Sequence, residues 1–273
     1  MFNITDWDDA YANAANIPGG DNWPAAWVAP AQKFRDQARG QLDIAYGADP
    51  REAYDLFLPE DAPKGLVVFV HGGFWVRLDK SYWSNLAAGP VAAGWAVAMP
   101  SYTLCPDTSV TGIVAQIASA VEHAAGQVAG PVRLTGHSAG GHIVTRLMCD
   151  DSPLSNDVAD RVRHVVSISG LHDLRPLLRT KLNDAIRLTP DEATRQSPAL
   201  CTPRGGIPLT CWVGQSERSE FLRQNDLLPN IWKGLGASTQ AIAEPDRHHF
   251  NVIDGLADAN SPLCKTLLGD SGF

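Results

Sequence analysis

The fold of this chain is decided by the stretch Val132-Arg133-Leu134-Thr135-Gly136-His137-Ser138-Ala139-Gly140-Gly141-His142-Ile143. A short apolar run breaks there into a Gly-x-Ser-x-Gly pentapeptide, and apolar residues then recur at helical spacing. A sharp strand-to-helix turn lifts a serine clear of its own backbone, and the glycines at 136 and 140 remove side chains that would collide across the turn. The pattern indicates a nucleophile elbow with Ser138 as nucleophile; a tight structural turn is the alternative.

Apolar strands alternate with helical stretches on both sides of this elbow. Strands that are apolar on both faces indicate a mostly parallel central sheet with helices on both faces, which is an α/β fold. We expect strands at 65–70, 95–100, 132–135, 165–169, 209–213 and 239–243, and helices at 81–93 and 110–128. Residues 41–58 form two alternating runs joined by turn residues, which predicts a hairpin at the antiparallel edge of the sheet.

The length of 273 residues and the lack of a Pro/Gly/Ser-rich linker predict a single domain over 1–273. Residues 1–40 show weak helical periodicity, and we expect them to pack over the core as a covering arm. The segment 171–208 is too long for a simple crossover, so it is a candidate for a small partial cap over the site.

Composition and charge narrow the class of protein. A net charge of -8 argues against nucleic acid as a partner, since phosphate binding needs clustered Lys and Arg. No apolar run is long enough for a membrane span, and the N-terminus lacks the pattern of a secretory signal. The five cysteines lack paired spacing, so we expect reduced thiols in a cytoplasmic protein. No metal-ligand spacing and no phosphate-binding glycine motif is present, and we expect no metal and no cofactor.

The segment His71-Gly72-Gly73-Phe74-Trp75 follows directly after a predicted buried strand. Two glycines at a strand end allow the backbone to turn so that its N–H groups point into a cavity, where they stabilise a developing oxyanion. We expect the donors to be the N–H groups of Gly73 and Phe74, or of Gly72, together with that of Ala139 after the nucleophile. A β-turn held by aromatic residues is the structural alternative.

A nucleophilic serine needs a general base, and in a serine, acid, histidine chain order the histidine follows the last strand. Of the eight histidines, His248 and His249 occupy that position. We favour His249 because the apolar Phe250 directly after it can anchor the loop and aim the ring. His71 is expected to brace its own loop.

The acid of such a triad is expected after the penultimate strand, where it accepts the second N–H of the histidine. Glu217 is the carboxylate nearest to that strand end. The alternatives are a surface role for Glu217 beside Arg218, or one of three other carboxylates as the acid. These are Glu220, Asp246 and Asp173.

Several blocks of the sequence together resemble the kynurenine formamidase (arylformamidase) branch of the α/β-hydrolases, which neighbours the hormone-sensitive-lipase-like esterases. The blocks are HGGFW at 71–75, GHSAGGHI at 136–143, SGLHDLRPL at 169–177, LTPDEA at 188–193 with Ser197-Pro198, VGQSERSEF at 213–221 and HHFNVI at 248–253. The resemblance covers about residues 45 to 260. It implies an α/β-hydrolase fold and catalysis by Ser138, the acid at position 217 and His249.

The chain departs from the family pattern at three positions. The family acid is typically Asp, and Glu217 is one methylene longer, although Glu serves this role in other α/β-hydrolases. His248 stands where the family typically has Asp, and Phe74 replaces the more usual Tyr. Loss of that hydroxyl is expected to alter substrate hydrogen bonding.

The resemblance implies a serine hydrolase that cleaves a small-molecule N-formyl arylamide such as N-formylkynurenine. Trp75, Phe74 and Tyr102 are candidate aromatic walls for the substrate; the alternative is that they belong to the core. Two other functions stay open. One is a general short-chain carboxylesterase, because the same machinery cleaves an ester or an activated amide. The other is a non-catalytic binding protein on the same scaffold. The sequence leaves the oligomeric state unassigned.

Overall fold

The computed structural model describes residues 4–269. The predicted domain extends over 1–273 and the predicted arm over 1–40, so residues 1–3 of both and residues 270–273 of the domain lie outside the described residues. The described residues form one eight-stranded sheet in the order β1-β2-β4-β3-β5-β6-β7-β8. The strands are β1 Gly40–Ala45, β2 Ala53–Phe57, β3 Leu66–Val70, β4 Ala96–Pro100, β5 Val132–His137, β6 Val162–Ile168, β7 Leu209–Gly214 and β8 Thr239–Glu244. The predicted α/β-hydrolase fold class is confirmed.

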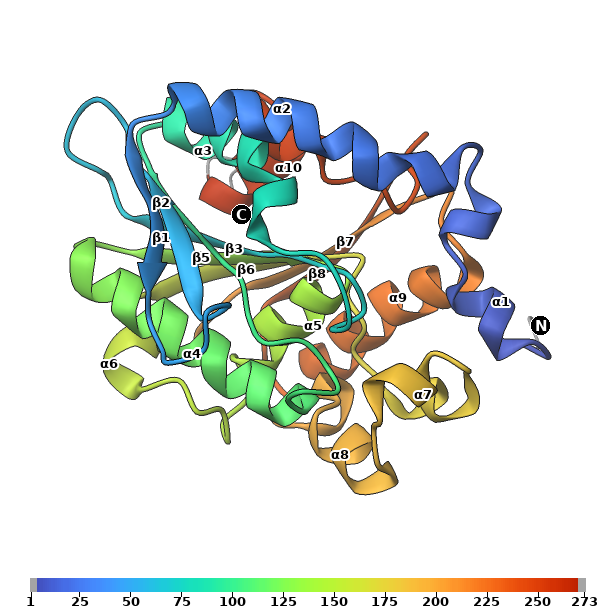
Figure 1. The fold of residues 1–273 in the computed structure, drawn as a ribbon. Helices are drawn as coiled ribbons and strands as arrows, with labels where there is room; N and C mark the ends of the chain where they lie inside the picture. Colours follow the sequence, from blue (N-terminus) through green and yellow to red (C-terminus); the bar gives the residue numbers. More distant parts are fainter. Residues whose placement is uncertain (1–3, 270–273) are drawn as a thin grey trace.

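Four helical segments precede β1, and from β3 onward helices alternate with the strands along the chain (Figure 1). The α-helices are α1 Trp7–Tyr11, α2 Trp23–Gln37, α3 Ala88–Ala92, α4 Val110–Gln127, α5 Ala139–Arg146, α6 Asn156–Ala159, α7 Asn183–Ile186, α8 Pro190–Arg195, α9 Ser219–Gly234 and α10 Pro262–Leu268. The 3₁₀ helices are η1 Ala14–Asn16, η2 Gly20–Asn22, η3 Lys80–Tyr82, η4 Ser84–Ala87, η5 Arg175–Arg179, η6 Pro198–Leu200 and η7 Asp254–Ala257.

The predicted hairpin forms the antiparallel edge of the sheet. β1 pairs antiparallel with β2, β2 pairs antiparallel with β4, and the remaining neighbours are parallel. The opposite edge strand, β8, is largely exposed or half-buried, so the expectation of strands apolar on both faces does not hold there. An edge strand has a neighbour on one side only, and its polar residues keep solvent contact.

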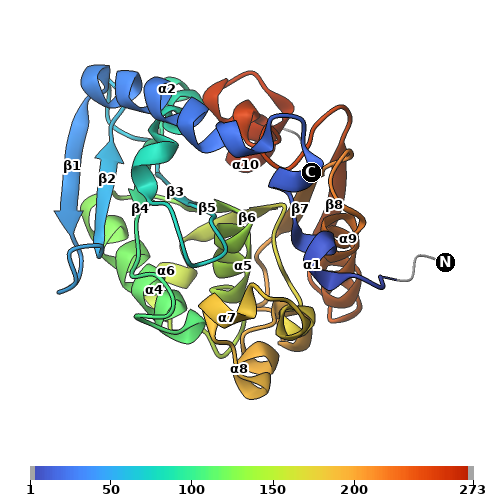
Figure 2. The same ribbon diagram turned by 45° about the vertical axis from the view of Figure 1, so that its right-hand side comes forward.

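Two apolar cores lie on opposite faces of the sheet because side chains alternate along each strand. In β3, Val68 and Val70 point into the core shared with α4, α5 and α9, whereas Val67 and Phe69 point into the core shared with α2, η4 and α10. Figures 1 and 2 show α2, α3 and α10 over one face and α4 and α5 over the other. The sheet is therefore covered on both sides, as the sequence predicts.

The stretch 81–93, predicted as one helix, is broken in the structure. It contains η3 and η4 followed by the short helix α3, because the backbone at Trp83 leaves the helical region with φ -131°. Pro90 lies in the first turn of α3, where its missing N–H costs no helical hydrogen bond. Among the described residues, no helix has the length and apolar character needed to cross a bilayer.

The N-terminal segment, residues 4–37, packs across the end of the sheet where the elbow lies. The Tyr11 hydroxyl at the end of α1 donates a 2.9 Å hydrogen bond to Glu220 Oε1 in α9, and the Tyr11 ring meets the edge of Phe221 at 5.9 Å. On α2, Trp27 contacts the rings of Trp83 and Phe250. These contacts fix the segment beside the loops that carry the candidate site.

Candidate active site

Ser138 occupies the turn between β5 and α5 with φ 55° and ψ -115°. This conformation is strained for a residue with a side chain, and strain of this kind occurs where a turn must present a reactive group. A Cβ at Gly140 would lie 2.0 Å from the Val70 carbonyl oxygen, and one at Gly136 would lie 2.4 Å from that of Gly140. The elbow therefore needs glycine at both positions.

Glu217 and His249 are brought together by the loops after β7 and β8. Glu217 Oε2 lies 2.6 Å from His249 Nδ1, and the Glu217 side chain has no exposed surface. The other oxygen, Oε1, accepts hydrogen bonds from Ser169 Oγ at 2.6 Å and from the Gly214 N–H at 2.9 Å. The carboxylate is thus held by three donors, with His249 Nδ1–H as one of them. In this tautomer, Nε2 of His249 is left without a proton.

The alternative acids have other partners or lie elsewhere. The Glu220 carboxylate accepts hydrogen bonds from Tyr11, Arg223 and Gln224. The Asp173 carboxylate is paired with Arg175 at 2.8 Å, and Asp246 occupies a left-handed position (φ 59°) in the loop before His248. His248 packs edge-on against Trp23 at 5.2 Å, whereas His249 faces Glu217.

His137, the residue before Ser138, supports the histidine loop in a way that the sequence analysis missed. His137 Nε2–H donates a 2.8 Å hydrogen bond to the backbone carbonyl of His249, and the two rings lie 4.6 Å apart. Burial lowers the pKa of His137 well below its ordinary value, and the neighbouring His249 lowers it further. His137 is therefore a neutral donor. Its position in the x of Gly-x-Ser is the one signal in the sequence that places it near the site.

Ser169, the first residue of the block at 169–177, is the second supporting residue, and its role was not predicted from the sequence. It follows β6 with φ 50°, and its N–H donates a 2.6 Å hydrogen bond to the Trp212 carbonyl. This places the hydroxyl against Glu217 Oε1. The sequence offers no signal for this contact beyond the position of a serine at the end of a strand.

The loop after β3 turns through three consecutive left-handed residues, Gly73, Phe74 and Trp75, with φ of 110°, 52° and 61°. A Cβ at Gly73 would lie 2.2 Å from the Arg77 carbonyl oxygen, so the turn requires glycine there. Within residues 4–269, the N–H groups of Gly73, Phe74 and Ala139 have no hydrogen-bond acceptor. These three N–H groups, which the sequence nominates as oxyanion donors, remain free to bind an anionic oxygen.

His71 braces this loop. Its Nδ1 lies 2.7 Å from the Gly72 carbonyl oxygen, and its ring stacks on that of Tyr102 with centroids 4.3 Å apart. The Tyr102 hydroxyl donates a hydrogen bond to the His71 carbonyl. Burial lowers the pKa of His71 to about 4, so the ring is neutral near pH 7.

Trp75 and Tyr102 do not lie where substrate walls were expected. Both are fully buried; Trp75 packs edge-on against His142 at 5.2 Å, and Tyr102 is covered by its contact with His71. Neither belongs to the lining of the cavity that reaches Ser138. The left-handed turn at 73–75 carries Trp75 away from the cavity, and this reversal has no signal in the spacing of the residues.

A cavity of about 390 Å³ contains both Ser138 and His249. Gly73 and Phe74 line it from the loop after β3, and Trp27, Trp83 and Phe250 supply aromatic surface. The N-terminal segment contributes residues 11–15, whereas none of the described lining residues comes from 171–208. The wall expected from a cap is therefore provided by the N-terminal segment.

Comparison with known proteins agrees with this architecture. Residues 67–269 match the model of the Alpha/beta hydrolase family. The chain is 30% identical to a kynurenine formamidase of Danio rerio over 250 residues, covering 87% of this chain and 84% of that protein. A kynurenine formamidase of Salmo salar is 28% identical over 253 residues, with the same two shares covered. The resemblance inferred from the sequence blocks is thereby confirmed.

A solved structure from Silicibacter sp. TM1040, of a protein provisionally assigned as a thioesterase, is also similar to this chain. It shares 46% of its residues and superposes with a TM-score of 0.92, covering 97% of this chain and all of the other. Both kinds of relative carry a hydrolase name, and the family match spans the elbow as well as the Glu217 and His249 loops. This chain belongs to the Alpha/beta hydrolase family.

Proposed function

We propose that the protein is a serine hydrolase in which Ser138 is the nucleophile, His249 the general base and Glu217 the acid that orients it. The observation that carries the proposal is the 2.6 Å contact between Glu217 Oε2 and His249 Nδ1, with His249 and Ser138 lining one cavity. A buried carboxylate on Nδ1 fixes the tautomer that leaves Nε2 free to accept a proton.

In the first half of the reaction, Ser138 Oγ attacks the carbonyl carbon of the substrate while His249 Nε2 takes the hydroxyl proton. The carbonyl oxygen becomes an oxyanion and is bound by the free N–H groups of Gly73, Phe74 and Ala139. The tetrahedral intermediate then collapses. The bond to the leaving amine or alcohol breaks, and the leaving group takes the proton held by His249.

In the second half, water attacks the acylated Ser138 and gives up a proton to His249 Nε2. The second tetrahedral intermediate uses the same N–H groups, and its collapse returns the proton to Ser138 Oγ and releases the acid. Glu217 stabilises the imidazolium of His249 in both halves. Removal of one preorganised oxyanion donor from a serine hydrolase raises the activation free energy by about 3 kcal/mol.

We propose an N-formyl arylamide as the substrate, so that the products are formate and an aryl amine. Two observations support this class. The chain is 30% identical to a kynurenine formamidase over most of both proteins, and the aromatic side chains that line the cavity with Ser138 include Trp27, Trp83 and Phe250. Aromatic walls of this kind bind an aryl ring by stacking and by burial of apolar surface.

A short acyl ester or thioester is the second candidate substrate. The 46% identity to a protein provisionally assigned as a thioesterase favours it. The attack on the carbonyl is the same, and only the leaving group differs. The two candidates are therefore distinguished by turnover and not by the identity of the catalytic residues.

The decisive measurement is kcat/KM for N-formylkynurenine, p-nitrophenyl acetate and a short acyl thioester under one set of conditions. We expect the formamide to give the highest value. Cleavage of the ester or thioester without cleavage of the formamide would refute the formamidase assignment and leave the serine hydrolase intact.

The alternative of a non-catalytic binding protein is tested by a fluorophosphonate probe. We expect the probe to label the wild-type protein and not Ser138→Ala. Failure to label the folded wild-type chain, or labelling that persists in Ser138→Ala, would contradict catalysis at Ser138.

A further inference from the structure

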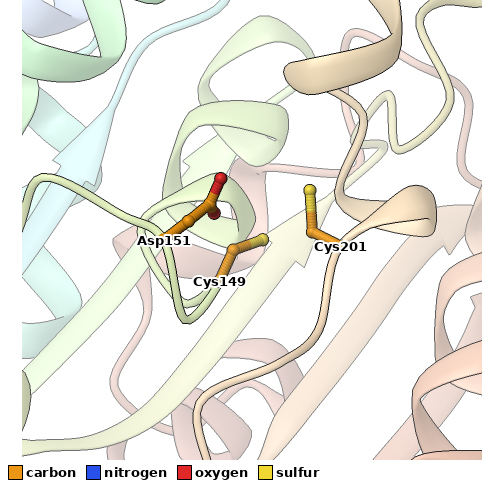
Figure 3. A group of neighbouring side chains, drawn as sticks. All are labelled: Cys149, Asp151 and Cys201. Atoms are coloured by element: carbon orange, nitrogen blue, oxygen red, sulfur yellow. The ribbon is translucent and has the colours of Figure 1, made fainter.

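At the end of α5 opposite to Ser138, the structure gathers two thiols and a carboxylate. One ligand atom from each of Cys149, Asp151 and Cys201 lies within 4.8 Å of the other two. Figure 3 shows Cys149 and Asp151 on the segment after α5, and Cys201 facing them from the segment after η6. Cys149 is buried, Cys201 is half-buried and Asp151 is exposed.

A short antiparallel bridge holds these two segments together. Cys149 pairs with Pro203, and the N–H of Asp150 donates a 3.0 Å hydrogen bond to the Thr202 carbonyl. On the other side of the pair, the N–H of Arg204 donates a 2.7 Å bond to the Met148 carbonyl. The backbone thus fixes the separation of the two cysteines without a covalent link, and both thiols are free.

We propose that Cys149, Cys201 and Asp151 form a binding site for a thiolate-preferring divalent cation of the zinc class. Two thiolates and a carboxylate are a ligand set that Zn²⁺ accepts, and soft sulfur ligands exclude Mg²⁺ and Ca²⁺. A tetrahedral Zn²⁺ with Zn–S bonds of about 2.3 Å separates its sulfurs by about 3.8 Å. The ligand atoms lie within 4.8 Å of one another, so they would close slightly around the ion, and water would complete the fourth position.

Arg146 supplies a positive charge beside the proposed site. Its Nη1 and Nη2 donate to Asp151 Oδ1 and Oδ2 at 2.7 and 2.9 Å, and its side chain is buried. Each carboxylate oxygen keeps a second lone pair for a cation, so the guanidinium orients the ligand and does not replace it. Two thiolates, one carboxylate and a divalent cation sum to one negative charge, which Arg146 neutralises.

The site is open to solvent at Asp151, whereas neither cysteine lines the adjoining surface cavity. Arg146 and Asp151 line a surface cavity of about 310 Å³, and the Asp151 side chain is 61% exposed. A cation therefore has an entry path, which a ligand set in a closed core would lack.

The bound ion would join the end of α5 to the end of the 171–208 segment. Ser138 precedes the first residue of the eight-residue helix α5, so about 12 Å of helix separates it from this site. The role is therefore structural and independent of hydrolysis. The sequence shows no metal-ligand spacing because Cys201 lies far along the chain from Cys149.

The test uses Co²⁺ as a spectroscopic substitute for zinc on the reduced, full-length chain without oxygen. We expect one equivalent of Co²⁺ to produce a thiolate-to-cobalt charge-transfer band, and one equivalent of Zn²⁺ to remove it. Cys201→Ser should abolish the band. Asp151→Asn should weaken cobalt binding by at least about 10- to 100-fold, the loss found when a metal site loses a partner that only hydrogen-bonds to a ligand. Cys105→Ala, a cysteine outside the cluster, should leave binding unchanged.

Circular dichroism tests whether each variant is folded. Cys201 and Asp151 are chosen for substitution because neither residue is fully buried. Absence of the band in the reduced wild type would overturn the proposal, as would a band that survives in Cys201→Ser. A third outcome would also overturn it: the chain forms a Cys149–Cys201 disulfide in air, with a loss of two hydrogens, and the reduced chain takes up no metal. Hydrolysis of p-nitrophenyl acetate should not change on metal removal, so this proposal and the proposed function fail independently.

Discussion

At the residue scale, the extra methylene of Glu217 is accommodated by hydrogen bonds at both carboxylate oxygens. Ser169 Oγ and the Gly214 N–H hold Oε1, and Oε2 is left for His249. The proposed mechanism predicts that Glu217→Gln lowers kcat by roughly 10³- to 10⁴-fold, because an amide can stabilise the wrong histidine tautomer and cannot stabilise the imidazolium. Steady-state kinetics with p-nitrophenyl acetate measures the effect.

Glu220→Gln is the matched control for this substitution. The Glu220 side chain is as buried as that of Glu217 and lies three residues away, but its carboxylate binds Tyr11, Arg223 and Gln224. We expect Glu220→Gln to reduce thermal stability and to leave kcat within a few-fold of wild type. Equal losses of kcat in the two variants would mean that Glu217 has no special role.

His137 gives a second prediction at this scale. His137→Leu removes the donor to the His249 carbonyl, which leaves that carbonyl without its protein partner and loosens the loop. We expect kcat to fall about tenfold, equivalent to about 1.4 kcal/mol, with little change in KM. His137→Gln can donate again from a side-chain amide and should recover part of the loss. If the two variants are equally impaired, the hydrogen bond does not position His249.

Some of these residues can be predicted from the sequence and others cannot, for a physical reason. Ser138, Glu217 and His249 follow strands, and a strand end in a parallel sheet has a definite place in space. The contacts of Ser169 and His137 depend on loop conformations that residue types do not encode. The same holds for Trp75, whose ring direction is set by three successive positive φ values.

At the scale of elements, the elbow depends on how closely α5 approaches β3. Gly140→Ala would place a Cβ 2.0 Å from the Val70 carbonyl oxygen, so the helix or the strand must move. We expect a loss of about 3 kcal/mol or more in the free energy of unfolding, together with loss of hydrolytic activity. Urea denaturation followed by circular dichroism gives the first quantity.

Gly126→Ala is the matched control, since Gly126 also lies in a helix, α4, but has no heavy atom within 4 Å of a Cβ placed there. Alanine there should leave activity unchanged and stabilise the protein by up to about 1 kcal/mol, because alanine favours the helix. A Gly140→Ala variant as stable and as active as Gly126→Ala would show that the elbow tolerates a side chain.

The helices and strands could be predicted where the apolar pattern of the sequence is long and has turn residues at both ends. The parallel strands and α4 have continuous apolar runs or clear periodicity, and they lie within a few residues of the prediction. The stretch 81–93 has apolar residues at helical spacing, yet tertiary contacts break it into 3₁₀ turns. Helix α9 was not anticipated, and Pro229 within it is one reason that its pattern is weak.

At the scale of the whole molecule, the candidate site is assembled from loops that follow β3, β5, β7 and β8, with the N-terminal segment as the outer wall. No single stretch of sequence contains it. The central strands place the loops at one edge of the sheet, and the two cores hold the sheet rigid beneath them. The N-terminal segment was expected to cover the core, but a pattern with weak periodicity could not show that residues 11–15 reach the cavity.

The stability of the whole fold depends on pH because several histidines are buried. His71, His164 and His172 are buried, and burial lowers the pKa of each to about 4. In the unfolded chain these rings have a pKa of about 6.5, so the unfolded state binds protons first as the pH falls. Their contribution to stability is complete above pH 6.5 and is lost as the pH falls toward 4.

His172 is the sharpest test of this effect. Its Nδ1–H donates to the Gln224 carbonyl at 2.9 Å, and its Nε2 accepts from Ser167 Oγ at 3.0 Å, so a second proton on the ring would remove that acceptor. For a pKa of about 4 against 6.5, this residue alone accounts for about 2 kcal/mol of stability lost between pH 7.5 and pH 5. His172→Gln should be less stable than wild type at pH 7.5, yet lose about 2 kcal/mol less on going to pH 5. Urea midpoints at both pH values measure the difference, and an identical loss in both proteins would show that His172 does not titrate on unfolding.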